Sequence, residues 1–110
     1  MNKSFSEYIE YNNKDEYFLD ENDEPLNGEQ VEYNDYQNNE ITILRFRNGY
    51  LDGDIFDSNG NFITQKPAVE KSGHVEYWRE NKLHRDNGEP AVFSNNFESK
   101  EWWENGKRIK

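Results

Sequence analysis

The sequence predicts an all-β protein, a single twisted antiparallel meander of stacked β-hairpins. Three observations point to this fold class. Short segments of β-branched and aromatic residues alternate with polar residues, at the period of two that suits a half-buried strand. Asn-Gly dipeptides, which favour tight hairpin turns, follow several of these segments. No segment has the apolar spacing of an amphipathic helix, so we expect about nine to eleven short strands and no helix.

The candidate strands are short and are separated by turn signals. In chain order they are Ser6–Tyr11, Glu29–Tyr36, Ile41–Arg47, Asp54–Asp57, His74–Trp78, Pro90–Ser94 and Lys100–Trp103. The dipeptides that could supply the positive φ angles of type I′ turns are Asn48–Gly49, Asn59–Gly60, Asn87–Gly88 and Asn105–Gly106. The stretch Thr64–Gly73 breaks the pattern, and we expect a longer loop there that joins two parts of one sheet.

Aromatic residues are expected to supply most of the core. The chain of 110 residues has 17 Phe, Tyr and Trp residues against 15 Ile, Leu and Val residues. Each aromatic side chain can bury about 150 to 250 Å². The residues predicted to lie in or near the core are Phe46, Phe56, Trp78, Phe93 and Trp103.

Charge is distributed unevenly along the single predicted domain (residues 1–110). Residues 1–40 carry twelve Asp and Glu against two Lys, a net charge of −10, whereas residues 41–110 carry eleven acids and eleven bases. A one-sided negative field attracts a basic partner. The same field disfavours direct binding to nucleic acid and to anionic membranes. A solvated acidic face is the simpler interpretation and stays open.

Cysteine content and the start of the chain bear on location. The chain has no cysteine, which is typical of a reducing compartment. The start, MNKSFSEYIEYNN, lacks the apolar stretch of a signal peptide, and no apolar run has the length of about 18 residues that a membrane span needs. We therefore expect a cytoplasmic protein in a bacterial cell, with a phage gene as an alternative origin.

Several phrases recur along the chain. Tyr77–Trp78 and Trp102–Trp103 lie 25 residues apart, in the Trp-rich repeats of residues 74–110, and Gly28 and Gly53 have the same separation. The stretch FLDENDEPL matches IFDSNGNFI, in which an Asp begins a turn between two strands. The unit is a hairpin of about two dozen residues, which must stack on its neighbours to bury its apolar face. One ring of each aromatic pair should face the core and the other the opposite side.

These repeats resemble a known family. RFRNGYLDGDIFDSNGNFI (residues 45–63) is similar to the MORN-repeat variant of bacteria. EYWRENKLHRDNGEPAVF (residues 76–93) and EWWENGK (residues 101–107) resemble a related bacterial and phage repeat built on Trp, Asn-Gly-Lys and Leu-His-Arg. The chain departs from that pattern at Glu80–Lys82, which lacks the Gly, and at Glu89, an insertion. The resemblance implies a β-meander, and it implies antitoxins, immunity proteins and interaction modules as functions.

Catalytic and metal-binding signatures are scarce. His84 lies in the Leu-His-Arg phrase of the repeat, so a structural role at a turn is expected for it. The phrase His-Arg-Asp also occurs in kinases, but a kinase needs more than twice this length. Asp20, Asn22 and Glu24 alternate as in a calcium loop, yet Pro25 stands where that loop needs Gly. We expect no enzyme, no cofactor and no metal.

Two functions of different classes follow. In the first, the acidic part binds the basic groove of a nuclease or other nucleic-acid-binding enzyme and inhibits it, as an antitoxin, an immunity protein or an anti-CRISPR-type counter-defence protein. In the second, the repeat is a structural adaptor, and the acidic part only solubilises it. The chain could be a monomer or a dimer paired through a sheet edge. The predicted partner-binding residues are Asp15, Glu16, Asp20, Glu21, Asp23, Glu24, Glu32, Tyr33, Asp35 and Tyr36.

Overall fold

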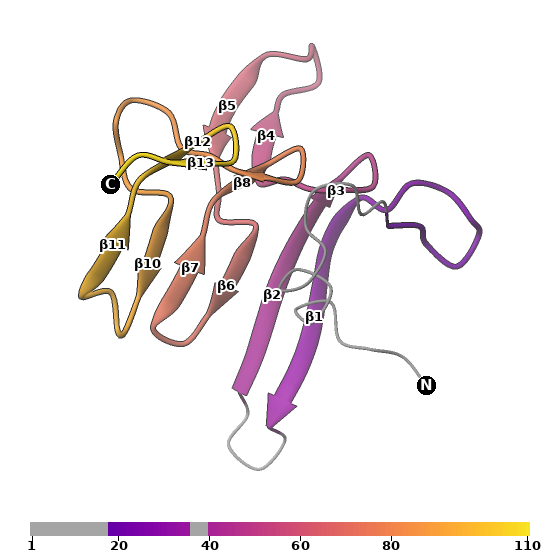
Figure 1. Cartoon of the computed structure of the whole chain (residues 1–110). Coiled ribbons are helices and arrows are strands. Elements are labelled where there is room, and N and C mark those ends of the chain that lie inside the picture. The colour runs from indigo at the N-terminus through magenta and orange to yellow at the C-terminus, as the bar shows by residue number, and fades with distance from the viewer. Residues whose placement is uncertain (1–17, 36–39) are drawn as a thin grey trace.

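The computed structural model describes residues 18–35 and 40–110, and this part of the chain is all-β (Figure 1). It contains thirteen strands, two more than the upper expectation, and no helix. The predicted fold class is confirmed. The strands are β1 (Gly28–Asp35), β2 (Glu40–Arg47), β3 (Tyr50–Leu51), β4 (Asp54–Phe56), β5 (Phe62–Gln65), β6 (Val69–Lys71), β7 (His74–Glu76), β8 (Trp78–Arg79), β9 (Lys82–Leu83), β10 (Val92–Ser94), β11 (Ser99–Glu101), β12 (Trp103–Glu104) and β13 (Lys107–Arg108). The predicted strand Ser6–Tyr11 lies outside the described residues.

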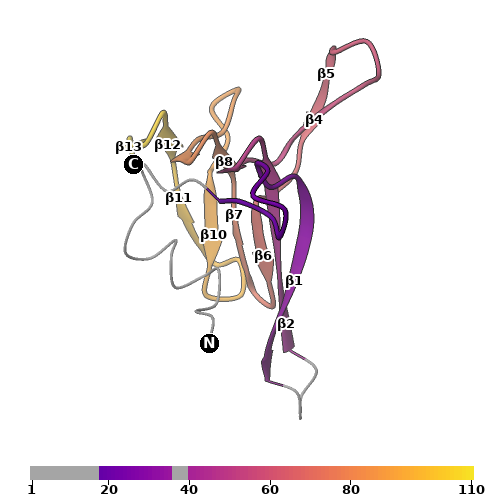
Figure 2. The same cartoon turned by 90° about the vertical axis from the view of Figure 1, so that its right-hand side faces the viewer.

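The meander is interrupted by hairpins that leave the main sheet. Seven strands form one antiparallel sheet in the order β1-β2-β6-β7-β10-β11, with β3 beside β2. The pairs β4–β5, β8–β9 and β12–β13 form separate two-stranded sheets. Figure 1 shows β8, β12 and β13 across one end of the main sheet, where β4–β5 rises above it. In the edge-on view of Figure 2, β4–β5 projects out of the plane of the sheet, and we call it the arm (residues 54–65).

Three two-residue turns stack along this end of the sheet, each on the unit before it. The second residue of each turn donates its N–H to the carbonyl of a leucine in the preceding unit. The first donates to the side chain that follows that leucine. The turn Asn48–Gly49 donates to Asn27 and Leu26, the turn Glu80–Asn81 to Asp52 and Leu51, and the turn Asn105–Gly106 to His84 and Leu83. These six hydrogen bonds are 2.8 to 3.1 Å long. The repeat read from the sequence is therefore a repeat of hydrogen bonds as well.

Asn81 completes the turn that lacks glycine. Glu80 and Asn81 have φ angles of +49° and +64°, the same sign as Asn48 and Gly49. The Asn81 side chain is buried, and its Oδ1 accepts the N–H of Leu51 at 2.7 Å. Asparagine tolerates the left-handed region better than most residues, so this unit keeps the turn without Gly. The type I′ expectation fails at Asn59–Gly60, where only Gly60 has a positive φ.

The aromatic pairs also recur as hydrogen bonds. Trp78 Nε1 donates to Glu76 at 2.8 Å, and Trp103 Nε1 donates to Glu101 at the same distance. Trp78 is 3% exposed and belongs to the core cluster, whereas its neighbour Tyr77 is half-buried beneath the guanidinium of Arg85 and is not part of that cluster. One ring of this pair therefore faces the core, as expected. Trp103 is only half-buried, so the two units differ in burial although their bonds match.

The main core is less aromatic than expected. Its cluster is Phe18, Leu26, Leu44, Phe46, Leu51, Ala68, Val69 and Trp78. Phe46 and Trp78 are buried as predicted, whereas Phe93 and Trp103 are half-buried. The prediction for Phe56 is wrong, because the arm lifts it away from the sheet and leaves it 40% exposed. It packs instead on Phe62, with ring centroids 5.9 Å apart, and beneath the guanidinium of Arg47.

Two further expectations are corrected by the backbone. The predicted loop Thr64–Gly73 contains β6, which pairs with β2 and β7. The one strongly apolar residue of β6, Val69, is followed by the charged Glu70 and Lys71, so the strand pattern is too short to be recognised. Gly28 and Gly53 are not equivalent: Gly28 needs its φ of +94°, whereas a Cβ at Gly53 would collide with the carbonyl of Lys66.

Candidate protein-binding site

The acidic loop Asp20–Glu24 is a tight turn closed by its first side chain. Asp20 Oδ1 accepts the backbone N–H groups of Asn22 and Glu24, at 2.8 and 3.0 Å. Asp20 N–H donates to the carbonyl of Glu24, and Asp23 N–H donates to the carbonyl of Asp20. The Asp20 carboxylate is therefore committed to folding the loop. The fourth residue, Asp23, has a φ of +60°, a region that L-residues enter at a cost.

The loop Asp57–Asn61 at the tip of the arm has the same four hydrogen bonds. Asp57 Oδ1 accepts from Asn59 and Asn61, both at 2.9 Å, and the two backbone bonds also recur. Gly60 takes the place of Asp23, with a φ of +84°. These N–H donors, that of Asn61 first, lower the pKa of Asp57. The match between the two stretches of sequence is thus confirmed as a shared loop geometry.

The two loops differ in charge. Glu21, Asp23 and Glu24 are exposed, and no ion pair to them is formed within residues 18–35 and 40–110. The corresponding residues of the arm are neutral: Ser58, Gly60 and Asn61. Since the neutral loop folds in the same way, the three carboxylates are not required for the conformation. The three carboxylates also repel one another, so their charges raise the free energy of the folded loop without contributing to its conformation.

Carboxylates in the second part of the chain are mostly engaged. Asp52 lies 2.9 Å from Arg47, and Glu70 lies 2.8 Å from Arg45. Glu76 and Glu101 accept hydrogen bonds from tryptophans, as described above. The Asp20–Glu24 loop differs from them in bringing three exposed carboxylates without an ion pair among the described residues into one turn.

The remaining predicted residues divide into two groups. Glu32 and Tyr33 lie on β1, and the backbone of Asp35 ends that strand roughly 23 Å from Gly28, since a strand rises about 3.3 Å per residue. In Figure 1 the indigo segment that precedes β1 lies near the start of that strand, whereas Asp35 is the last residue of β1. The predicted residues therefore form two clusters rather than one. Asp15, Glu16 and Tyr36 lie outside the described residues.

Tyr33 belongs to an exposed apolar strip that was not predicted. Tyr33 is 55% exposed and pairs across the ladder with Ile41, which is 37% exposed. Val31, two residues earlier on the same face, is 51% exposed. Glu32 points to the opposite face, opposite the buried Thr42. Alternation in β1 shows that Val31 and Tyr33 share one face of the strand, but it does not show whether other residues cover that face. The sequence could therefore not predict that this face is exposed.

A charged cluster at the base of the arm was also missed. Arg79 bonds Asp54 at 2.6 Å and Asp86 at 2.9 Å, and His84 Nε2 lies 2.8 Å from Asp86. The Arg79 guanidinium, followed by His84, lowers the pKa of Asp86 to about 2. Asp86 in turn, with Asp54, raises the pKa of Arg79. These residues are up to 32 positions apart, so no local motif marks the cluster.

His84 has the structural role expected for it. Its Nδ1 accepts the N–H of Asn105 at 3.0 Å, and this bond leaves the Nε2 proton for Asp86. Nδ1 therefore holds the last stacked turn, and Nε2 contacts the charged cluster at the base of the arm. Within the described residues, no three His, Cys, Asp or Glu side chains are grouped as ligands of a metal ion. The same part of the chain contains no apolar helix of the length that spans a membrane.

Comparison of the chain with models of known protein families, with curated proteins and with solved structures finds no match. The resemblance to MORN-type repeats therefore stays a prediction.

Proposed function

We propose that the protein is a non-enzymatic acidic inhibitor that binds a basic nucleic-acid-handling enzyme, as an antitoxin, immunity protein or phage counter-defence protein. The observation that carries this proposal is the pair of matching loops. Glu21, Asp23 and Glu24 add exposed negative charge to a loop that folds equally well with neutral residues at Asp57–Asn61. Charge that folding does not need is available for a partner.

The physical mechanism is occupation of a basic groove. Clustered carboxylates attract a groove lined with Lys and Arg, which otherwise receives phosphates. The loop steers the encounter, and the exposed strip at Tyr33 offers an aromatic anchor of the kind that dominates binding energy in interfaces. Binding of this kind blocks the enzyme without chemistry and weakens as salt rises.

An exchange between the two loops tests the proposal with the geometry held constant. In the neutral-loop variant, Glu21→Ser, Asp23→Gly and Glu24→Asn give the acidic loop the residues of the arm loop. A relocated-charge control carries these changes together with Ser58→Glu, Gly60→Asp and Asn61→Glu, so its net charge equals that of the wild type. Each protein is used to capture partners from extracts of the native host, uninfected and phage-infected, at low and high salt. The captured enzyme is then assayed on nucleic acid against increasing amounts of each protein.

We expect the wild type to capture and inhibit one basic nucleic-acid enzyme, and both variants to do so much more weakly. Failure of the relocated-charge control would show that the position of the charge matters and not the net charge. Equal inhibition by all three proteins would contradict the proposal.

The second candidate function is a structural MORN-like adaptor. The stacked turns favour it, because their recurring hydrogen bonds make a rigid scaffold of repeated units. An adaptor that binds through its repeats would capture its partners equally well after the loop exchange and at high salt. The same capture experiment therefore distinguishes the two functions.

A further inference from the structure

Each aromatic pair places its first ring beneath a positive side chain. In the first pair, the Arg85 guanidinium lies 3.8 Å from the centre of the Tyr77 ring. Arg85 also donates to the carbonyl of Pro90 and pairs with Glu89 at 3.2 Å. In the second pair, 25 residues later, the ammonium of Lys110 lies 5.3 Å from the centre of the Trp102 ring. The interaction is conserved between the units, but the cation is different.

The second cation is held less firmly than the first. The Lys110 side chain is exposed and forms no ion pair within the part of the chain that the structure describes. Its longer distance from the ring also gives a weaker cation–π contact than that of Arg85. The flexible stem of a lysine can move its ammonium aside at little cost, so the Trp102 ring can accept another cation.

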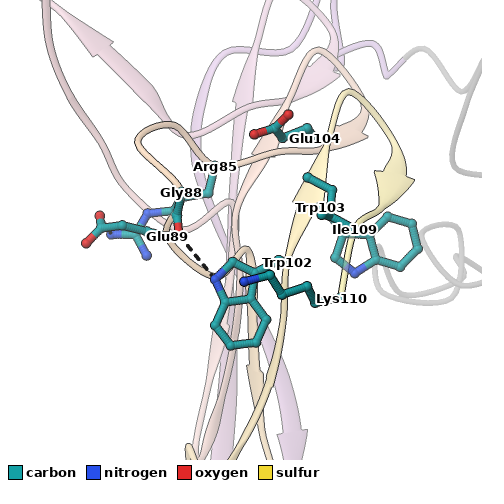
Figure 3. Close-up of a pocket in the computed structure, with 8 residues that line it drawn as sticks. All are labelled: Arg85, Gly88, Glu89, Trp102, Trp103, Glu104, Ile109 and Lys110. Carbon is teal, nitrogen blue, oxygen red and sulfur yellow. Dashed lines mark hydrogen bonds and ion pairs between the residues drawn. The ribbon is translucent and has the colours of Figure 1, made fainter.

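The surroundings of Trp102 form a pocket of about 130 Å³ (Figure 3). Trp102 is held in place by the bond from its Nε1 to the carbonyl of Gly88 at 3.1 Å. Trp103 and Ile109 supply further apolar walls, and Glu89 and Glu104 also line the pocket, with the carboxylate of Glu89 paired to Arg85. The Glu104 side chain forms no ion pair among the described residues. Aromatic walls with nearby carboxylates are the composition that recognises organic cations.

We propose that this pocket is a binding site for the guanidinium of an arginine side chain presented by another protein. We call it the Trp102 seat (Trp102, Trp103, Ile109, Glu89 and Glu104). Arg85 on Tyr77 shows how the repeat holds a guanidinium, stacked on the ring and bonded at its edge. A planar guanidinium can stack on Trp102 and still donate to a carboxylate, which an ammonium does less well. The ammonium of Lys110 covers the Trp102 ring in the free protein, and the arginine of the partner displaces this ammonium. The seat does not depend on the acidic loop, so either proposal can fail while the other stands.

The experiment follows the three tryptophan indole N–H signals of the full chain by NMR. The probe is L-argininamide, and L-citrullinamide, which has the same shape without the charge, is the control at matched ionic strength. We expect argininamide to shift the Trp102 signal with weak, saturable affinity, and citrullinamide to leave it unchanged. The buried Trp78 signal should not move with either compound. Equal shifts with both compounds, or a shift without saturation, would overturn the proposal.

Removing the resident cation gives the sharpest result. Lys110→Ala should tighten argininamide binding by about two- to tenfold, because apparent affinity scales with the fraction of molecules whose seat is open. Lys107→Ala removes the same charge from the same hairpin without touching the ring, and it should leave the affinity unchanged or slightly higher. Trp102→Leu should abolish the saturable shifts of neighbouring Glu104. If Lys110→Ala weakens binding or acts only as Lys107→Ala does, lysine displacement is wrong.

Discussion

The Asp20 and Asp57 loops have the same turn geometry and the same four hydrogen bonds, yet they differ in charge and in the residues that they connect. Both begin with an Asp that accepts two N–H groups, and both have a fourth residue with positive φ. Those two features are sufficient for the turn. The identities of the other residues are then free, and in the first loop they are acidic. The fold of the loop does not require this charge.

The residues that flank the two loops differ strongly in burial. The Asp20 loop connects Phe18 and Leu26, which are 8% and 7% exposed and belong to the main core. The Asp57 loop connects Phe56 and Phe62, which are 40% and 49% exposed at the end of the arm. The same motif is therefore coupled to the whole fold in one place and to a local hairpin in the other. Local units of this kind open without unfolding the rest of a protein.

Removing the capping Asp from each loop should give the largest difference. Asp20→Ala deprives the N–H groups of Asn22 and Glu24 of their acceptor, and we expect a loss of about 1 to 2 kcal/mol in the free energy of unfolding. Asp57→Ala removes the same two bonds, but the arm opens locally, so the global change should be much smaller than that of Asp20→Ala. Urea unfolding followed by tryptophan fluorescence measures both. Equal losses would mean that the arm unfolds together with the sheet.

A smaller effect separates the cost of backbone strain from the cost of charge. Asp23→Gly places in the acidic loop the residue that the arm uses, and it should stabilise the protein by about 0.5 to 1 kcal/mol by removing the strain of φ +60°. Glu21→Gln removes one charge with no change in φ, and its effect should be below about 0.5 kcal/mol. Unfolding is measured at low and high salt. A gain for Asp23→Gly that disappears in high salt would show that charge repulsion, and not the backbone, is the cost.

The sequence predicts these loops well because their determinants are local. An Asp followed by a turn residue three positions later is visible in the chain, as are the Asn-Gly turns and the pairs Tyr77–Trp78 and Trp102–Trp103. The fold class follows from the same local signals. Glu80–Asn81 was harder, because the turn depends on the buried Asn81 side chain and its bond to Leu51, 30 residues away.

The arm and the two separated acidic clusters were not predictable in the same way. The alternation of residues in β4 and β5 is the same as in strands of the main sheet. The only sign of an insertion is the spacing of the leucines that accept the turn hydrogen bonds, which is 32 residues from Leu51 to Leu83 and 25 residues from Leu26 to Leu51. The charge count located the acidic part of the chain, but it could not show that β1 separates its members. Such facts depend on packing between distant segments.

A further effect appears only in acid, where the segments that hold the two loops respond differently. Arg79 ties the base of the arm through Asp54 and Asp86, whereas the Asp20 loop rests on apolar contacts. Because Arg79 lowers the pKa of Asp86 from 3.8 to about 2, its stabilisation is complete above about pH 4 and is lost as the pH falls through 2. The contribution should be about 1 kcal/mol or less, since the Asp86 side chain is 44% exposed.

Hydrogen exchange in the arm, measured by NMR from about pH 4.5 down to about pH 2.5, tests this difference with Asp86→Asn as the matched control. Amide protection in β4 and β5, corrected for the intrinsic exchange rate, should fall toward low pH in the wild type and stay flatter in Asp86→Asn, which has no carboxylate to protonate. The amide of Leu26, which donates to the carbonyl of Phe18 at 3.0 Å beside the Asp20 loop, should respond alike in both proteins. Parallel loss of arm protection in the two proteins would mean that Asp54 alone holds Arg79, and that the acid sensitivity of the arm has another source.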